Sequence, residues 1–147
     1  MIQFTIKSDP QFGKKAQDLM PTANDCYQLA ILQMTTIRQR TQSGLDVDGQ
    51  QFAEYSEQTQ KRKTELGRNP DLVDLTDRNR MLGQSMQVKR LSDGGVIFFA
   101  DANRREIALI HNEGSGRMPK RTFFSVSHAD AQALAKKLQE LINARSR

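Results

Sequence analysis

The sequence predicts an α+β fold, in which a long N-terminal helix and a C-terminal helix pack on a small antiparallel sheet. Residues 2–6 alternate between apolar and polar side chains, as in a short strand. Apolar residues recur at helical spacing over residues 16–37 and again over residues 131–142. Five consecutive apolar residues at 96–100 are typical of a strand that is buried on both faces at the centre of a sheet.

Composition favours one domain with a small hydrophobic core. The chain has 147 residues, of which 37% are hydrophobic and 27% are charged. A single cysteine, Cys26, excludes an internal disulfide framework and fits a reducing cytosol. No apolar run approaches the ~18 residues that a membrane span needs, so we expect no membrane contact.

The first helix has a clear start and end. Asp9 is a suitable N-cap with Pro10 at the first helical position, and the apolar spacing stops at Ile37. Because the apolar pattern continues through Pro21, we expect either a kink or a fresh helix start there. Gly44 can adopt the left-handed conformation that commonly follows a helix.

A tight acidic turn, with Asp46, Asp48 and Gly49, is expected to follow this helix. The spacing of the two aspartates resembles the start of a calcium loop, but the glycine falls at the fourth position of such a loop instead of the sixth. We therefore expect a plain acidic turn and no metal site. After the turn, Phe52 and Tyr55 are the only large apolar anchors before Leu66.

Residues 50–69 form a polar arm in this interpretation. Ser56 could cap a short helix, but the segment carries no apolar face that would hold it to a core. We expect the arm to be mobile in an isolated chain or to be held by a neighbouring subunit.

The second half of the chain predicts several short elements. Thr76 is expected to cap a short helix that carries Met81, Leu82 and Met86. Residues 86–100 are expected to form a β-hairpin that turns at Asp93-Gly94-Gly95. Beyond the hairpin we expect a short apolar element at 107–110, a loop around Pro119, a strand-like segment at 123–126, and a final helix capped by Ser127 and Asp130.

The most basic part of the chain lies between residues 104 and 121, which we interpret as a basic loop. It carries Arg104, Arg105, Arg117, Lys120 and Arg121 against Glu106 and Glu113. Such a segment is either a solvated surface or a contact for nucleic acid or an acidic protein.

The residues that commonly carry catalysis are sparse. Neither His111 nor His128 has a carboxylate or second histidine at ligand spacing, so we expect His111 to be a packed, hydrogen-bonded histidine and His128 to be exposed. Cys26 is expected to be a buried, inert thiol. The glycines lack the lysine and the helix start of a phosphate loop. We predict no catalytic residues, no cofactor and no enzyme activity.

Several motifs, taken in order, resemble those of the phage virion morphogenesis family, which includes tail-completion proteins and the G-like protein of Mu-like phages. They are Ile37 to Arg40, Gly44 to Phe52, Tyr55-Ser56, Lys61 to Lys63, Val73 to Thr76, Arg80-Met81-Leu82, Ala108 to Gly114 and Pro119 to Phe124. The resemblance covers residues 30–140. Two departures are Asn79, where the family usually has glycine, and the absence of the usual proline after Arg121.

The resemblance implies a structural virion protein that completes the tail or joins it to the head as a homo-oligomeric ring at the head–tail junction. Implied partners are further copies of the chain, in a hexamer or a dodecamer, other phage neck, connector or tail-tube proteins, and double-stranded DNA within the ring. It implies residence in the virion, after assembly in the cytoplasm of the bacterial host. The whole of residues 1–147 would be one tail-completion domain.

The candidate subunit-interface or DNA-channel residues are Asp46, Asp48, Phe52, Glu54, Tyr55, Arg104, Arg105, Arg117, Lys120 and Arg121. We expect Arg121 to pair with an acid on the next subunit, for example in residues 46–57. The second interpretation is a small DNA-binding protein, which the sequence pI of about 9.6 favours.

Overall fold

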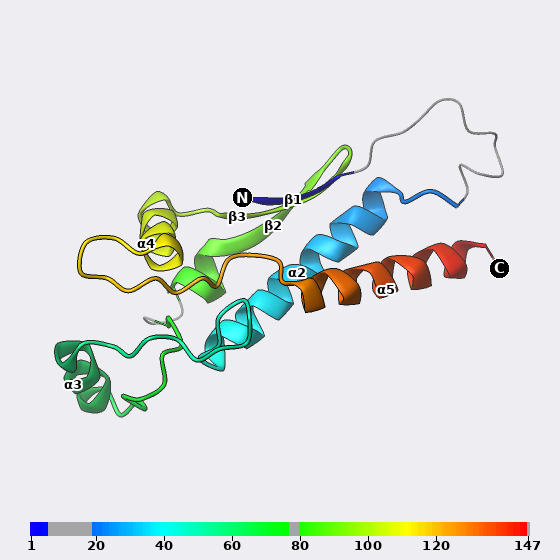
Figure 1. The fold of residues 1–147 in the computed structure, drawn as a ribbon. Coiled ribbons are helices and arrows are strands. Elements are labelled where there is room, and N and C mark those ends of the chain that lie inside the picture. The colour runs from blue at the N-terminus through cyan, green and yellow to red at the C-terminus, as the bar shows by residue number, and fades with distance from the viewer. Residues whose placement is uncertain (6–18, 77–79, 147) are drawn as a thin grey trace. The chain divides into compact units, whose positions relative to one another are not determined.

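Helices and a three-stranded sheet form the structure, which confirms the predicted α+β class (Figure 1). The computed structural model describes residues 1–5, 19–76 and 80–146. Its elements are β1 (Ile2–Thr5), α2 (Ala23–Gln42), α3 (Glu57–Glu65), the π-helix η1 (Arg80–Ser85), β2 (Met86–Leu91), β3 (Gly94–Phe99), α4 (Ala102–Glu113) and α5 (His128–Arg145).

Two units divide the chain, and each combines segments that are far apart in the sequence. Unit 1 contains Met1–Thr36, Met86–Phe98 and Val126–Arg147, and unit 2 contains Ile37–Ser85 and Phe99–Ser125. The boundaries fall inside α2 and β3. Among the described residues, no helix is both long enough and apolar enough to span a membrane.

The sheet of unit 1 has the strand order β1-β3-β2, so the apolar strand β3 is central, as its continuous apolar sequence predicts. β1 pairs antiparallel with β3, with Ile2 opposite Ile97. The predicted hairpin is present, but its turn is Ser92-Asp93, because Gly94 and Gly95 belong to β3.

The predicted turn at Asp93-Gly94-Gly95 was wrong because Gly94 and Gly95 lie inside β3, where they let β1 and α2 pack closely against its backbone. A Cβ on Gly94 would lie 1.9 Å from the carbonyl oxygen of Phe4 in the neighbouring strand. A Cβ on Gly95 would lie 3.0 Å from the Cα of Tyr27 in α2. Glycine is therefore needed in β3 because a strand and a helix approach its backbone.

The helix α2 makes the fresh start near Pro21 that was one of the two expectations. The Thr22 hydroxyl accepts from the Asp25 N–H at 3.2 Å, and the Asp25 carboxylate accepts from the Thr22 N–H at 2.7 Å. This reciprocal arrangement is a capping box. The helix start predicted at Asp9 and Pro10 lies outside the described residues.

The helix α5 runs antiparallel to α2 within unit 1. Near its start, Asp130 accepts from the Gln33 side chain at 2.9 Å, and at its end Arg145 pairs with Asp25. Burial raises the pKa of Asp25, but hydrogen bonds from Thr22 and Arg145 outweigh this effect and lower the pKa.

The predicted cap of α5 is confirmed, because Ser127 and Asp130 form a complete capping box. Its predicted apolar stripe is only partly buried. Leu134 is buried and Leu138 is half-buried, whereas Ala131 is exposed. The free thiol of Cys26 is buried, as expected, and burial raises its pKa.

Unit 2 differs from the sequence prediction in three elements. The helix α4 occupies the first part of the predicted basic loop and includes the apolar residues 107–110. The predicted helix after Thr76 is instead the π-helix η1, and Met86 belongs to β2. Residues 123–126 form no strand.

The core of unit 2 is formed around aromatic and aliphatic side chains. The rings of Phe99 and Phe124 lie 5.1 Å apart, and those of Phe99 and Phe123 lie 6.5 Å apart in an edge-to-face arrangement. Its buried apolar side chains are Ile37, Phe52, Val73, Leu75, Met81, Leu82, Phe99, Ala108 and Phe123.

Candidate functional site

The acidic turn after α2 is closed by its own aspartate. Gly44 has a left-handed φ of 80°, as its position predicts. One carboxylate oxygen of Asp46 accepts from the N–H groups of Asp48 and Gln50, at 2.9 and 2.8 Å. This carboxylate stabilises the turn by the side chain-to-backbone bonding typical of aspartate.

Arg121 is buried inside unit 2, with a relative exposure of 2%. Its guanidinium donates to the carbonyl oxygens of Ala53 and Glu54, at 2.9 and 2.8 Å, and lies 5.3 Å from the centre of the Tyr55 ring. Burial lowers its pKa. The partners that we expected on a neighbouring subunit are therefore backbone atoms of the same chain, in the predicted stretch 46–57.

The same two segments also meet through their backbones, because the Val47 N–H donates to the Thr122 carbonyl at 2.8 Å. Asn112 stabilises the second segment: its side-chain oxygen accepts from the N–H groups of Phe123 and Phe124. The stretch 46–55 is thus hydrogen-bonded to the segment 121–124, although Glu54 and Arg121 are 67 residues apart in the sequence.

The polar arm contains the helix α3, which Ser56 caps as predicted. Polar contacts attach it to the following loop. The buried Lys63 ammonium pairs with Asp74 at 3.2 Å and also donates to the Leu72 carbonyl. It lies 5.0 Å from the centre of the Tyr55 ring. The buried Lys63 therefore attaches α3 to the loop that follows it. We had not expected this attachment, because the segment has no apolar face.

Tyr55 also supports an unusual backbone conformation. Leu75 is buried and has a φ of 49°, in the left-handed region that non-glycine residues rarely adopt. Its N–H donates to the Tyr55 hydroxyl at 3.0 Å. This bond and the burial of the Leu75 side chain offset the cost of the conformation, about 1–2 kcal/mol.

His111, near the end of α4, differs from the expected hydrogen-bonded histidine. Its Nδ1 atom is buried and has no hydrogen-bond partner among the described residues. Burial, together with the nearby charge of Arg121, lowers its pKa from 6.5 to about 4. The imidazole is therefore neutral at pH 7.

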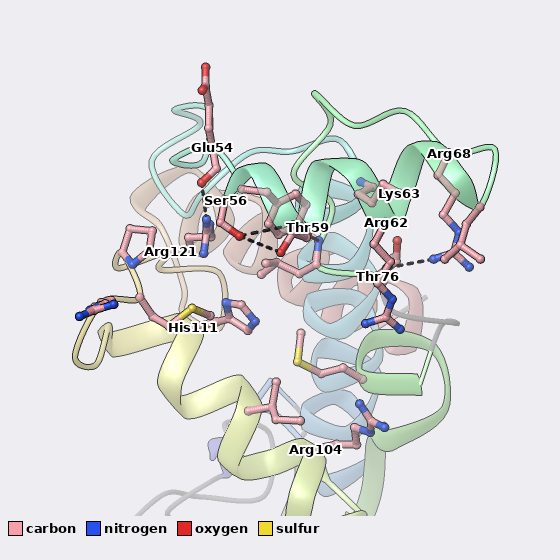
Figure 2. Close-up of a pocket in the computed structure, with 18 residues that line it drawn as sticks. Glu54, Ser56, Thr59, Arg62, Lys63, Arg68, Thr76, Arg104, His111 and Arg121 are labelled. Carbon is pink, nitrogen blue, oxygen red and sulfur yellow. Dashed lines mark hydrogen bonds between the residues drawn. The ribbon is translucent and has the colours of Figure 1, made fainter.

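A pocket of about 520 Å³ lies in unit 2 between α3, α4 and the loop that follows α4 (Figure 2). In the part of the chain that the structure describes, Glu54 is the only carboxylate that lines this pocket, and Figure 2 shows its side chain directed away from the space between the helices. The cationic lining residues are Arg62, Lys63, Arg68, Arg104, Arg117 and Arg121. Among the described residues, no cluster of histidine, cysteine and acidic side chains could hold a metal ion.

The structure brings half of the sequence-predicted candidates to this pocket. Glu54, Tyr55, Arg104, Arg117 and Arg121 line it. The others do not: Phe52 is buried, Arg105 and Lys120 are exposed, and in the acidic turn Asp46 is half-buried and Asp48 is exposed.

The lining residues of α3 were missed, although their spacing was visible in the sequence. Thr59, Arg62, Lys63 and Leu66 recur at intervals of three and four, which places them on one face of a helix that begins at Ser56. On α4, Arg104, Ile107 and His111 follow the same rule. From the sequence, the segment that contains α3 was interpreted as a polar arm and the segment that contains α4 as a basic loop, so neither helix face was recognised.

Comparisons with models of protein families, with curated proteins and with solved structures found no match for this chain.

Proposed function

We propose that the protein is a structural component of a phage virion that completes the tail or joins it to the head, and that it acts as a homo-oligomeric ring at the head–tail junction. Other neck, connector or tail-tube proteins would be its neighbours. Rings of this kind close through heterologous contacts, in which two different surfaces of the same chain meet.

The motifs on which the resemblance depends are in direct contact within unit 2, and this observation carries the proposal. Arg40 donates to the carbonyl oxygens of Phe123 and Ser125. The contacts of Tyr55 with Leu75 and of Lys63 with Asp74 connect three more motif segments, and Arg121 donates to the Glu54 carbonyl, next to Tyr55.

Residues whose contacts stabilise the fold of one unit are the kind that appear in the sequence motifs of a family. The contacts therefore explain in physical terms why these particular residues would recur together. They support the resemblance more strongly than isolated motifs would.

A DNA-binding protein is the second candidate, because exposed cations are present on and beside α4. Arg105, Arg117 and Lys120 are exposed. The two functions differ in what the dilute chain does. A DNA-binding protein would bind duplex DNA as a monomer, with an affinity that falls steeply with salt. In a ring, by contrast, a strong electrostatic field would arise only on assembly, because each subunit adds the same modest positive charge.

The experiment that tests the ring is the mass of the purified full chain over a range of concentrations, with electron microscopy of the assembled fraction. We expect a closed oligomer at high concentration and little binding of duplex DNA by the dilute monomer at ~50 mM salt. A chain that remains monomeric at the highest soluble concentration would contradict the proposal. Tight, salt-sensitive DNA binding by that monomer would establish the second candidate instead.

A further inference from the structure

The pocket of unit 2 combines positive charge with exposed apolar side chains. Leu66, Ile107 and Met118 line it, with relative exposures of 51, 37 and 41%. Large apolar side chains are unexceptional when they are scattered singly over a surface. Here three of them surround one concave space that is also lined by six cationic side chains of the described residues, which is an arrangement typical of a binding site.

Some of these cations have charge available for a ligand. Lys63 is engaged with Asp74, and Arg121 with the backbone of residues 53–54. Arg104 and Arg117 have no side-chain partner among the described residues. Figure 2 shows Arg104 at the α4 side of the pocket.

We infer that this pocket binds an acidic peptide segment of a partner protein, with the apolar side chains of the segment against Leu66, Ile107 and Met118 and its carboxylates against Arg104 and Arg117. Charge complementarity carries the choice of ligand, because Glu54 is the only carboxylate that lines the pocket among the described residues, and its side chain is directed away. The inference goes beyond the proposed function and does not depend on ring formation.

A peptide fits these observations better than duplex DNA. Duplex DNA has a convex backbone, and proteins contact its phosphates with cations on a surface that follows this curve. The phosphates offer no apolar group that could contact the three exposed apolar residues. The space of about 520 Å³ lies within the range of pockets that enclose a small ligand or a few side chains. Neutral His111, which also lines it, adds no charge that would favour phosphate at pH 7.

The test is binding of a fluorescein-labelled peptide of alternating glutamate and leucine to the full chain, followed by fluorescence anisotropy. The chain offers adjacent residues as matched controls. Arg104 lines the pocket whereas Arg105 does not, and both belong to α4. Likewise Met118 lines it, whereas Leu109, with 53% exposure, does not.

We expect Arg104→Glu and Met118→Asp each to weaken peptide binding by about tenfold or more, because the first removes a charge-assisted contact and the second removes an apolar contact. Arg105→Glu and Leu109→Asp should change it by about twofold or less, since at physiological salt a charge outside the pocket is screened over about 8 Å. Arg117→Glu, in the exposed loop, repeats the charge test at a position where misfolding is not expected.

The inference is overturned if the unaltered chain does not bind the peptide, or if the pocket variants and their controls bind it equally well. It is also overturned if duplex DNA binds with the same dependence on Arg104 and Met118, because the site would then be a nucleic-acid site. A peptide with lysine in place of glutamate should not bind.

Discussion

Replacement of Arg121 by methionine is the most direct test of how unit 2 is held together. Methionine keeps most of the side-chain volume but removes the guanidinium, which donates to the carbonyl oxygens of Ala53 and Glu54. Hydrogen bonds from a charged donor contribute about 1.5–3 kcal/mol each, and the contact with the Tyr55 ring contributes about 1 kcal/mol.

The cost of burying the charge offsets part of this sum. An arginine with 2% exposure has lost nearly all of its hydration, and methionine recovers that free energy. The two carbonyl oxygens lose their donors, however, and an unsatisfied buried group costs about 1–3 kcal/mol. We therefore expect Arg121→Met to lower the free energy of unfolding of unit 2 by about 3 kcal/mol, and Arg121→Lys to lower it by about half as much, because an ammonium cannot reproduce the planar fork.

The assay is urea unfolding followed by tyrosine fluorescence. The chain has two tyrosines and no tryptophan, so in a Tyr27→Phe background Tyr55 is the only strong fluorophore and reports on unit 2. With a slope of about 1–3 kcal/mol per M of urea, the midpoint should fall by about 1–3 M. Lys120→Met is the matched control, since Lys120 is exposed and its replacement should change stability by less than about 0.5 kcal/mol. Equal midpoints for Arg121→Met and Lys120→Met would refute the reasoning.

Three further predictions follow from the same unit. The unfolded chain protonates His111 near pH 6.5 but the folded chain only near pH 4, so the free energy of unfolding should decrease by about 1–2 kcal/mol as pH falls through this window. His111→Gln should flatten that part of the profile and His128→Gln should not, and identical profiles would show that His111 is not responsible. Phe123→Ala should cost about 3–5 kcal/mol, because Phe123 is fully buried; an unchanged midpoint in urea would contradict this. Amides of residues 50–69 should exchange hydrogen faster than those of α2 in the dilute chain, since buried apolar contacts are few there; equal protection in a verified monomer would oppose it.

Periodicity and capping residues, which act over a few neighbours, allowed several elements to be predicted from the sequence. The short strand that opens the chain, observed at Ile2–Thr5, the central strand β3 and the α5 cap at Ser127 are confirmed. The left-handed Gly44 and the helix cap at Ser56 are confirmed too. Each depends on local rules that operate before any tertiary contact forms.

Local signals were insufficient where a distant segment decided the outcome. Gly94 and Gly95 looked like turn residues, but the close approach of Phe4 and Tyr27 requires glycine inside a strand. The apolar residues 107–110 belong to a helix whose N-cap, Asp101, was not recognised in the sequence.

The candidate site shows the same division. The sequence by itself determined that residues 46–57 are acidic and that residues 104–121 are basic. Only the tertiary structure decided that Arg121 contacts residues 53–54 of its own chain, and that Arg104 and Arg62 line one pocket. Sequence spacing defines which residues share a helix face, but which faces meet depends on how the chain closes loops of dozens of residues, and no local pattern encodes that.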